Sequence, residues 1–136
     1  MEKIKLLFTC PHGGKEKLDI PRDRNNLPPY CDDEFIVNRE IKTPELTESI
    51  CKNIENLSGK QPYMIIANYD REYVDFNREE LCAFEKSSIL AKEKYSTYHN
   101  DISLKTNEMF SQNDLYLKKN IVYYPAITLK GWRVTY

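Results

Sequence analysis

The sequence predicts an α/β fold in which a mostly parallel sheet is flanked by helices. Two apolar runs, Ile4 to Phe8 and Tyr63 to Ala67, have the length and composition of buried strands. A helical segment lies between them in the sequence, and the order strand, helix, strand favours a parallel pair. Because the carboxyl ends of parallel strands meet at one edge of a sheet, the polar residues that follow each run are expected to form a site there.

The sequence contains residues that indicate both ends of the first helix. Thr43, Pro44 and Glu45 are typical of an N-cap, a proline at the first helical position and an acidic first turn. Gly59 is a stop signal. The apolar residues between these boundaries recur at helical spacing and are Leu46, Ile50, Ile54 and Leu57.

A second helix is expected from about Ser87 to about Phe110. Its approximate apolar stripe is formed by Ile89, Leu90, Tyr95, Tyr98, Ile102 and Met109. Residues 121–124 are a candidate third strand. The stretch from Pro11 to Pro29, rich in glycine, proline and charge, is expected to be a long loop, and such loops in compact domains are usually functional or mobile.

Composition excludes several classes of protein. The 136 residues, 40% of them hydrophobic, suffice for one domain with a modest core. The formal charge is −1 and no basic block could follow a phosphate backbone, so nucleic-acid binding is not expected. No apolar run approaches the roughly 20 residues that span a bilayer, and no signal-peptide region follows Met1. We therefore expect a cytoplasmic protein that makes no membrane contact.

The cysteines show no metal-binding or disulfide pattern. They are scattered along the chain without a C-x-x-C pair and are Cys10, Cys31, Cys51 and Cys82. Reduced and mostly buried thiols are the expectation.

His12 is the first candidate site residue. It follows the first strand in the run Cys10-Pro11-His12-Gly13-Gly14, where Gly13 and Gly14 let backbone or ligand approach closely. A role as base or metal ligand and a role as a hydrogen-bonded loop histidine are both open. One histidine cannot hold a catalytic zinc ion, which usually takes three protein ligands. The acidic cluster Asp32-Asp33-Glu34 is a better placed partner than Glu16, although a solvated acidic turn would look the same.

A second candidate site follows the second strand. Arg71 and Arg78 carry guanidinium forks that bind carboxylates, and Asn77 adds an amide beside one of them. Internal ion pairs of these arginines with Asp75, Glu79 or Glu80 are the alternative. We expect a turn after Asp75 that directs Asn77 and Arg78 at the site. His99, flanked by polar residues on the second helix, is either a surface or core histidine or a site residue.

Together these features resemble the N-formylglutamate amidohydrolase family. Over roughly residues 4 to 110 the chain carries Pro11-His12-Gly13-Gly14, then Asp33, then Arg71-x-x-x-Asp75-x-Asn77-Arg78, then Tyr98-His99-Asn100. Members of the family have a P-H-[SG]-G loop and an S-R-x-x-x-D-x-N-R signature. Asp70 stands where the family usually has serine.

The resemblance implies a fold like that of the zinc carboxypeptidases and deacylases. It also implies hydrolysis of an N-acyl amino acid, typically N-formyl-L-glutamate to formate and glutamate, with a divalent metal of the zinc type. His12 and Asp33 would be metal ligands, and Arg71, Asn77 and Arg78 would bind the substrate carboxylate. Residues expected beside the site are Gly13, Gly14, Asp75 and His99.

The chain also departs from the family pattern. Members are typically much longer, and here no histidine follows His99 and no acidic residue follows Asp114, so a third ligand and a late general base have no match. We expect one partial amidohydrolase-like domain over residues 1–136, with a divergent C-terminal tail over 111–136 and little activity. The alternative is a non-catalytic module that binds a small carboxylate, or a fragment that needs a second polypeptide.

Overall fold

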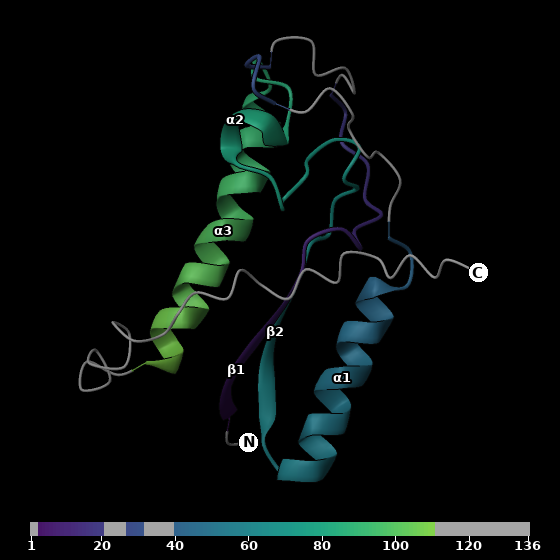
Figure 1. Ribbon diagram of the computed structural model, residues 1–136, viewed down its shortest axis with the longest axis vertical. Helices are drawn as coiled ribbons and strands as arrows, with labels where there is room; N and C mark the ends of the chain where they lie inside the picture. The colour runs from purple at the N-terminus through teal and green to yellow at the C-terminus, as the bar shows by residue number, and fades with distance from the viewer. Residues whose placement is uncertain (1–2, 21–26, 32–39, 111–136) are drawn as a thin grey trace.

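The computed structural model describes residues 3–20, 27–31 and 40–110 (Figure 1). Its elements along the chain are β1 (Lys3–Cys10), α1 (Thr43–Ser58), β2 (Gln61–Ile66), α2 (Glu80–Ala83) and α3 (Ile89–Met109). Asp33, the candidate strand at 121–124 and the tail at 111–136 lie outside the described residues. Among the described helices, none combines the length and the apolar character that crossing a membrane requires.

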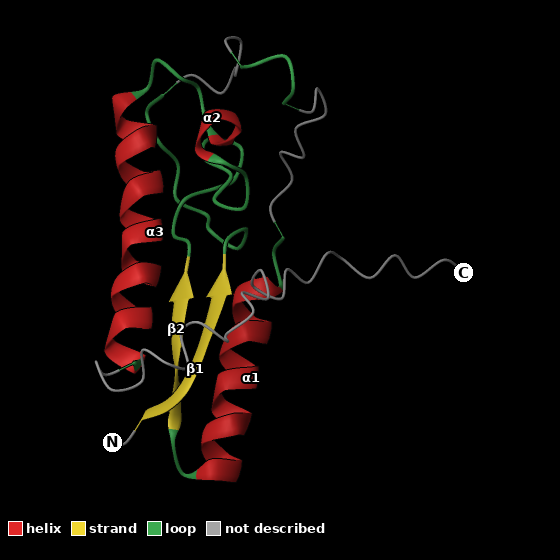
Figure 2. Cartoon of the chain, turned by 60° about the vertical axis from the view of Figure 1, so that its left-hand side comes forward, coloured by secondary structure: helices red, strands yellow, loops and turns green. Residues whose placement is uncertain are grey.

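The α/β class and the parallel pair are confirmed. β1 and β2 form a two-stranded parallel sheet in which Leu7 is opposite Tyr63 and Cys10 is opposite Ile66. α1 makes the crossover between the strands. In both ribbon views the sheet lies between α1 and α3 (Figures 1 and 2). The polar loops predicted to share one edge of the sheet therefore leave the strands at the same end.

The predicted ends of α1 are close to the observed ones. Gly59 stops the helix in the left-handed conformation, with φ of 69°, and its N–H donates to the Glu55 carbonyl at 2.8 Å. Thr43 is the first helical residue and not the cap, because its hydroxyl donates to the Glu40 carbonyl at 2.8 Å. That bond fixes Glu40 at the start of the helix.

The predicted apolar stripe of α1 is only half correct. Ile50 and Ile54 are partly buried, whereas Leu46 and Leu57 are exposed, and Cys51 is the residue that is fully buried. The buried face is thus centred on Cys51. The described sheet has only two strands, so it is too narrow to cover a wider stripe.

β1 was expected to be largely buried, and this prediction is wrong for its amino-terminal half. Leu6 is exposed, and burial becomes complete only at Cys10. The reason is geometric, since the strand enters the packed part of the molecule only at its carboxyl end.

α3 confirms the second predicted helix. Ser88 caps it by accepting a hydrogen bond from the Ala91 N–H at 3.1 Å. Ile89 and Leu90 were expected in the apolar stripe, but both are exposed, and Ala91 is the residue of the first turn that packs into the core. The buried residues further along are Tyr95, Tyr98 and Met109.

The core lies beyond the sheet, between α3 and the segment that follows β2. Phe76 is 4.7 Å from Tyr98 between ring centroids, and Phe84 is 5.6 Å from Tyr95. The buried cluster consists of Leu18, Ala67, Tyr73, Val74, Phe76, Ala83, Phe84, Ala91, Tyr95 and Tyr98. The loops that carry the candidate residues therefore rest on a packed base.

The expectation of four reduced thiols is wrong for two of them. Cys31 and Cys82 form a disulfide across 51 positions of sequence, with Cα atoms 5.6 Å apart. Cys10 and Cys51 are free and buried. The pair is brought together by the tertiary fold, so no local spacing signals it.

Candidate functional site

Two loops run side by side at the carboxyl end of the strands. The N–H groups of Lys15 and Glu16 both donate to the Asn68 carbonyl at 2.9 Å, and the Asp70 N–H donates to the Glu16 carbonyl at 2.9 Å. Glu16 and Tyr69 form a parallel bridge. The pairing of β1 with β2 thus continues past the strands and holds the histidine loop against the arginine loop.

Gly13 and Gly14 allow this close packing. A Cβ atom on Gly14 would overlap the backbone of Asn68 and Tyr69. A Cβ atom on Gly13 would overlap the Pro44 ring at the start of α1. The glycines predicted to permit close approach therefore admit neighbouring parts of the chain itself.

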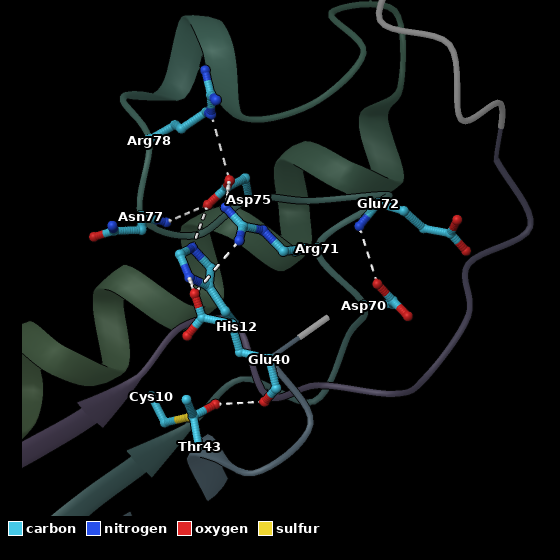
Figure 3. A network of polar contacts seen from close by, with 10 residues as sticks. All are labelled: Cys10, His12, Glu40, Thr43, Asp70, Arg71, Glu72, Asp75, Asn77 and Arg78. Carbon is cyan, nitrogen blue, oxygen red and sulfur yellow. Dashed lines mark hydrogen bonds and ion pairs between the residues drawn. The ribbon is translucent and has the colours of Figure 1, made fainter. Parts of the chain in front are cut away.

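His12 lies at the centre of a buried polar network (Figure 3). Its side chain is only 6% exposed. Nε2 lies 2.8 Å from Oδ1 of Asp75, and Nδ1 lies 3.3 Å from Oε1 of Glu40. The imidazole is thus held between two carboxylates that come from different segments of the chain.

Asp75 is the residue on which the network converges. Its Oδ1 accepts from the Asn77 N–H at 3.1 Å, and its Oδ2 accepts from Arg71 Nη2 at 2.7 Å and lies 3.4 Å from Arg78 Nε. Burial alone would raise the pKa of Asp75, but the hydrogen bonds and charges of His12 and Arg71 outweigh burial and hold this pKa well below its usual range. Asp75 is therefore a carboxylate at neutral pH.

Arg71 joins the two carboxylates. Its Nη1 lies 3.7 Å from Oε1 of Glu40, while Nη2 is paired with Asp75. Its side chain is 6% exposed. A buried guanidinium paired in this way positions the carboxylates on either side of His12, because its fork has fixed geometry.

The expected turn after Asp75 is present. The Arg78 N–H donates to the Asp75 carbonyl at 3.2 Å, and the Arg78 carbonyl accepts from the Tyr95 hydroxyl at 2.8 Å. Asn77 is exposed, and the Arg78 side chain is 19% exposed. In Figure 3, Arg78 lies on the opposite side of Asp75 from Glu40, and Asn77 lies beside Asp75. Their predicted role in binding a substrate carboxylate stays a prediction, as does that of Arg71.

His99 and Glu16 lie outside this network. The His99 ring packs against Tyr95, with centroids 4.3 Å apart, and is hydrogen-bonded to the Phe76 backbone. Burial lowers the pKa of His99. Through the Phe76 backbone, His99 contacts the turn that follows Asp75. Glu16 is exposed and contributes only its backbone to the loop pairing.

Glu40 is the site residue that sequence reasoning missed. The acidic cluster at 32–34 was the predicted partner of His12, and Asp33 of that cluster lies outside the described residues. A usable signal existed, since Glu40 stands just before the predicted start of α1 and a residue there is fixed by the helix. Its N–H donates to the His12 carbonyl at 3.2 Å, a contact that sequence alone does not predict.

A neutral His12 imidazole cannot donate a hydrogen bond to both carboxylates. A neutral imidazole has one N–H, and if Nε2–H donates to Asp75, the lone pair of Nδ1 faces an oxygen of Glu40. Two lone pairs at 3.3 Å need a proton or a cation between them. Two ligands that are each about 2.1 Å from one tetrahedral zinc ion lie roughly 3.4 Å apart, so the Nδ1 and Oε1 positions fit a shared cation.

Comparisons with protein-family models, with curated proteins and with solved structures return no match for this chain. The resemblance to the N-formylglutamate amidohydrolases therefore stays a prediction from the motifs, and the site has to be judged on its own geometry.

Proposed function

We propose that this chain binds a divalent cation of the zinc type between His12 and Glu40. We further propose that it acts, as the N-formylglutamate amidohydrolases do, on a small N-acyl amino acid. The observation that carries the proposal is the carboxylate on each side of one buried imidazole. A histidine that binds a metal almost always gives its other ring N–H to a carboxylate, and Asp75 is placed for that role.

The residues of the network have separate roles in this proposal. His12 Nδ1 and a Glu40 oxygen hold the cation. Asp75 accepts a hydrogen bond from Nε2–H, which fixes the tautomer and the orientation of the ring. Arg71 lies against both carboxylates and holds them in place. A bound cation of this type supplies a Lewis acid for the acyl carbonyl and lowers the pKa of water.

The described residues provide two protein ligands, whereas catalytic zinc sites usually have three. Asp33, which the resemblance implies as a metal ligand with His12, would be a third ligand beside His12 and Glu40 in this proposal. With two ligands the geometry around a cation is loosely fixed, so we expect weak binding and slow hydrolysis. The carboxypeptidase-like fold and the cytoplasmic location are parts of the same proposal.

Metal binding tests the proposal directly. We expect zinc titrated calorimetrically into the oxidised protein to bind, and His12→Ala or Glu40→Gln to weaken the affinity at least tenfold. Asp75→Asn should weaken it by roughly 10- to 100-fold, the range for ligand-orienting carboxylates. Glu45→Gln is the matched control, since Glu45 is an exposed carboxylate in the first turn of α1. Equal binding by all variants would refute the site.

Formate release from N-formylglutamate, with and without added zinc or cobalt, tests the reaction. We expect turnover that depends on the cation, is lost in His12→Ala, and is more than tenfold below a typical enzyme value of about 10 s⁻¹. Other N-formyl amino acids tested in parallel would define the substrate. Cation binding without release of formate from any of them would leave the metal site standing and reject the hydrolase.

A second candidate function is non-catalytic binding of a small carboxylate. The observation that favours it is the partial exposure of Arg78 next to the exposed Asn77. Glutamate binding that survives His12→Ala and needs no cation, but is lost in Arg78→Gln, would support this function. Binding that is lost in His12→Ala would support the metal-dependent one.

A further inference from the structure

A second group of metal-competent side chains lies beside α2, apart from the His12 network. Cys31 and Cys82 are joined there, and Oε1 of Glu79 lies 3.4 Å from the sulfur of Cys82. The two sulfurs and a Glu79 oxygen all lie within 4.8 Å of one another. Both cysteines are buried, whereas Glu79 is exposed. The group is thus covered by protein on one side and open to solvent through Glu79.

The surrounding structure holds these residues in place. The Cys82 N–H donates to the Glu79 carbonyl at 2.9 Å, and the Cys31 N–H donates to the Pro28 carbonyl at 3.0 Å. The Tyr30 hydroxyl is hydrogen-bonded to the Glu79 carboxylate. The Ala83 carbonyl, next to Cys82, accepts from the Asp75 N–H at 2.8 Å. The backbones of Cys31 and Cys82 and the side chain of Glu79 therefore have contacts besides the disulfide.

We propose that Cys31, Cys82 and Glu79 form a site with two states: a thiolate site for a zinc-type cation when the cysteines are reduced, and a disulfide when they are oxidised. Two thiolates and a carboxylate are ligands that zinc prefers, and three protein ligands leave one position open. Thiolates about 2.3 Å from a tetrahedral ion lie roughly 3.8 Å apart. Rotation of the cysteine side chains can supply that separation when their Cα atoms are 5.6 Å apart.

The two states interconvert by thiol–disulfide exchange with a small-molecule disulfide. One cysteine thiolate attacks a sulfur of the small disulfide, forms a mixed disulfide and expels one small thiolate. The second cysteine thiolate then attacks the protein sulfur of the mixed disulfide and expels the other small thiolate. Two electrons pass from the protein sulfurs to the small disulfide. The cation leaves as a divalent ion without a change of oxidation state.

The reduced state is relevant to a cytoplasmic protein. Cytoplasmic thiols are kept reduced, so the Cys31–Cys82 disulfide would be open there most of the time. Open thiolates near a carboxylate are the form that takes up zinc. Oxidation would then release the cation and close a covalent link around the segment that contains Glu40 and Asp75. This site does not depend on the cation site proposed at His12.

Cobalt binding to the reduced 136-residue chain tests the proposal, because thiolate ligands give cobalt a charge-transfer absorption that imidazole and carboxylate ligands do not. We expect this band in the reduced wild-type protein and not in the oxidised protein. Cys82→Ser and Cys31→Ser should each abolish it. Glu79→Gln should keep the band and weaken the affinity about 10-fold or more.

Two controls separate this site from other ligands. Cys51→Ser should keep the band, because Cys51 is a free buried thiol on α1. His12→Ala should also keep it, which makes failure here distinguishable from failure of the His12 site. Absence of the band from the reduced wild-type protein, or its persistence in both Cys31→Ser and Cys82→Ser, would overturn the proposal. Circular dichroism of the variants shows whether loss of the band reflects loss of fold.

The exchange step has its own readout. A small-molecule disulfide added to the zinc-loaded reduced protein should release zinc to a chromophoric chelator in step with the loss of two thiols per chain. Thiol loss without zinc release would contradict the coupling between the two states.

Discussion

The two ends of the sheet carry the same kinds of residue in different settings. At the carboxyl end, the ion pair of Arg71 with Asp75 is buried and shared with His12. At the amino end, Lys105 pairs with Glu108 in the open, with side chains 42% and 51% exposed. Charge alone therefore does not define a site. The buried pair is held in one geometry by its neighbours, whereas the exposed pair is screened by water.

The comparison also explains where the stability of the molecule lies. The aromatic core and the disulfide are both at the carboxyl end, around the loops that carry the network. At the amino end, Lys3 and Lys105 lie over the Tyr63 ring at 5.4 and 5.9 Å, and Leu6 is exposed. We expect the loops after the strands to be more rigid than the start of the strands, which reverses the usual relation between strands and loops.

The largest expected effect is the loss of one charge from the buried pair. Asp75→Asn should lower the free energy of unfolding by about 3–5 kcal/mol, because it leaves Arg71 and Arg78 without their shared carboxylate. Glu108→Gln, the matched change at the amino end, should cost less than about 1 kcal/mol. Urea unfolding followed by circular dichroism at pH 7 measures both. Similar values for the two variants would remove the contrast between the ends.

Loss of the disulfide should have the next largest effect. Closing a loop of 51 residues restricts the unfolded chain, and we expect Cys31→Ser with Cys82→Ser to cost about 2–4 kcal/mol. A reductant should destabilise the wild-type protein and leave the double variant unchanged. If the reductant had the same effect on both, the stabilisation would come from another source.

Alanine substitutions at Gly14 and Gly59 should lower the stability at the two ends of the sheet for different physical reasons. Gly14→Ala should cost about 1–3 kcal/mol, because the new methyl group meets the backbone of Asn68 and Tyr69, which has little room to move. Gly59→Ala, just before β2, meets no atom and should cost about 1 kcal/mol through its left-handed conformation alone. Thermal unfolding of the two variants ranks them. A smaller shift for Gly14→Ala would show that the two loops are not tightly packed.

The smallest expected effect is on the pH dependence of the free energy of unfolding. Burial lowers the pKa of His99 from 6.5, so the unfolded chain takes up a proton at this residue more readily than the folded protein does. Its contribution to stability is present above pH 6.5 and is lost as the pH falls below that value. His99→Gln should remove this part of the loss between pH 7.5 and 5.5, as measured by urea unfolding. Identical pH profiles for variant and wild type would show that partial burial does not lower the pKa of His99.

Local sequence signals predicted the elements of this fold well. Pro44 and Gly59 mark the ends of α1 through their own backbone chemistry, and an apolar stripe indicated α3, so both helices were predicted with small errors at their ends. The exposure of Leu57 and Ile89 could not be predicted, because it depends on how far the sheet and the core extend. The short helix α2 was also missed, since four residues are too few to show a period.

The sequence predicted those residues of the candidate site whose positions follow directly from the two strands. His12 and Asp75 follow the two strands, and the parallel order of the strands brings them together. Glu40 and the Cys31–Cys82 pair were missed because their partners are distant in sequence, and the backbone contact between Glu40 and His12 arises only in the folded chain. Arg71 was predicted to bind a substrate carboxylate or to pair with an internal acid such as Asp75. The structure shows the pair with Asp75, and the substrate role stays a prediction.

Crystals of the oxidised protein soaked in zinc would test the central claim most directly, because the disulfide then occupies the cysteine site. Anomalous scattering should place one zinc ion about 2.1 Å from both His12 Nδ1 and a Glu40 oxygen, with Asp75 still hydrogen-bonded to Nε2. Direct contact between His12 and Glu40 with no anomalous peak beside them would contradict the account and leave the network as a structural ion-pair cluster.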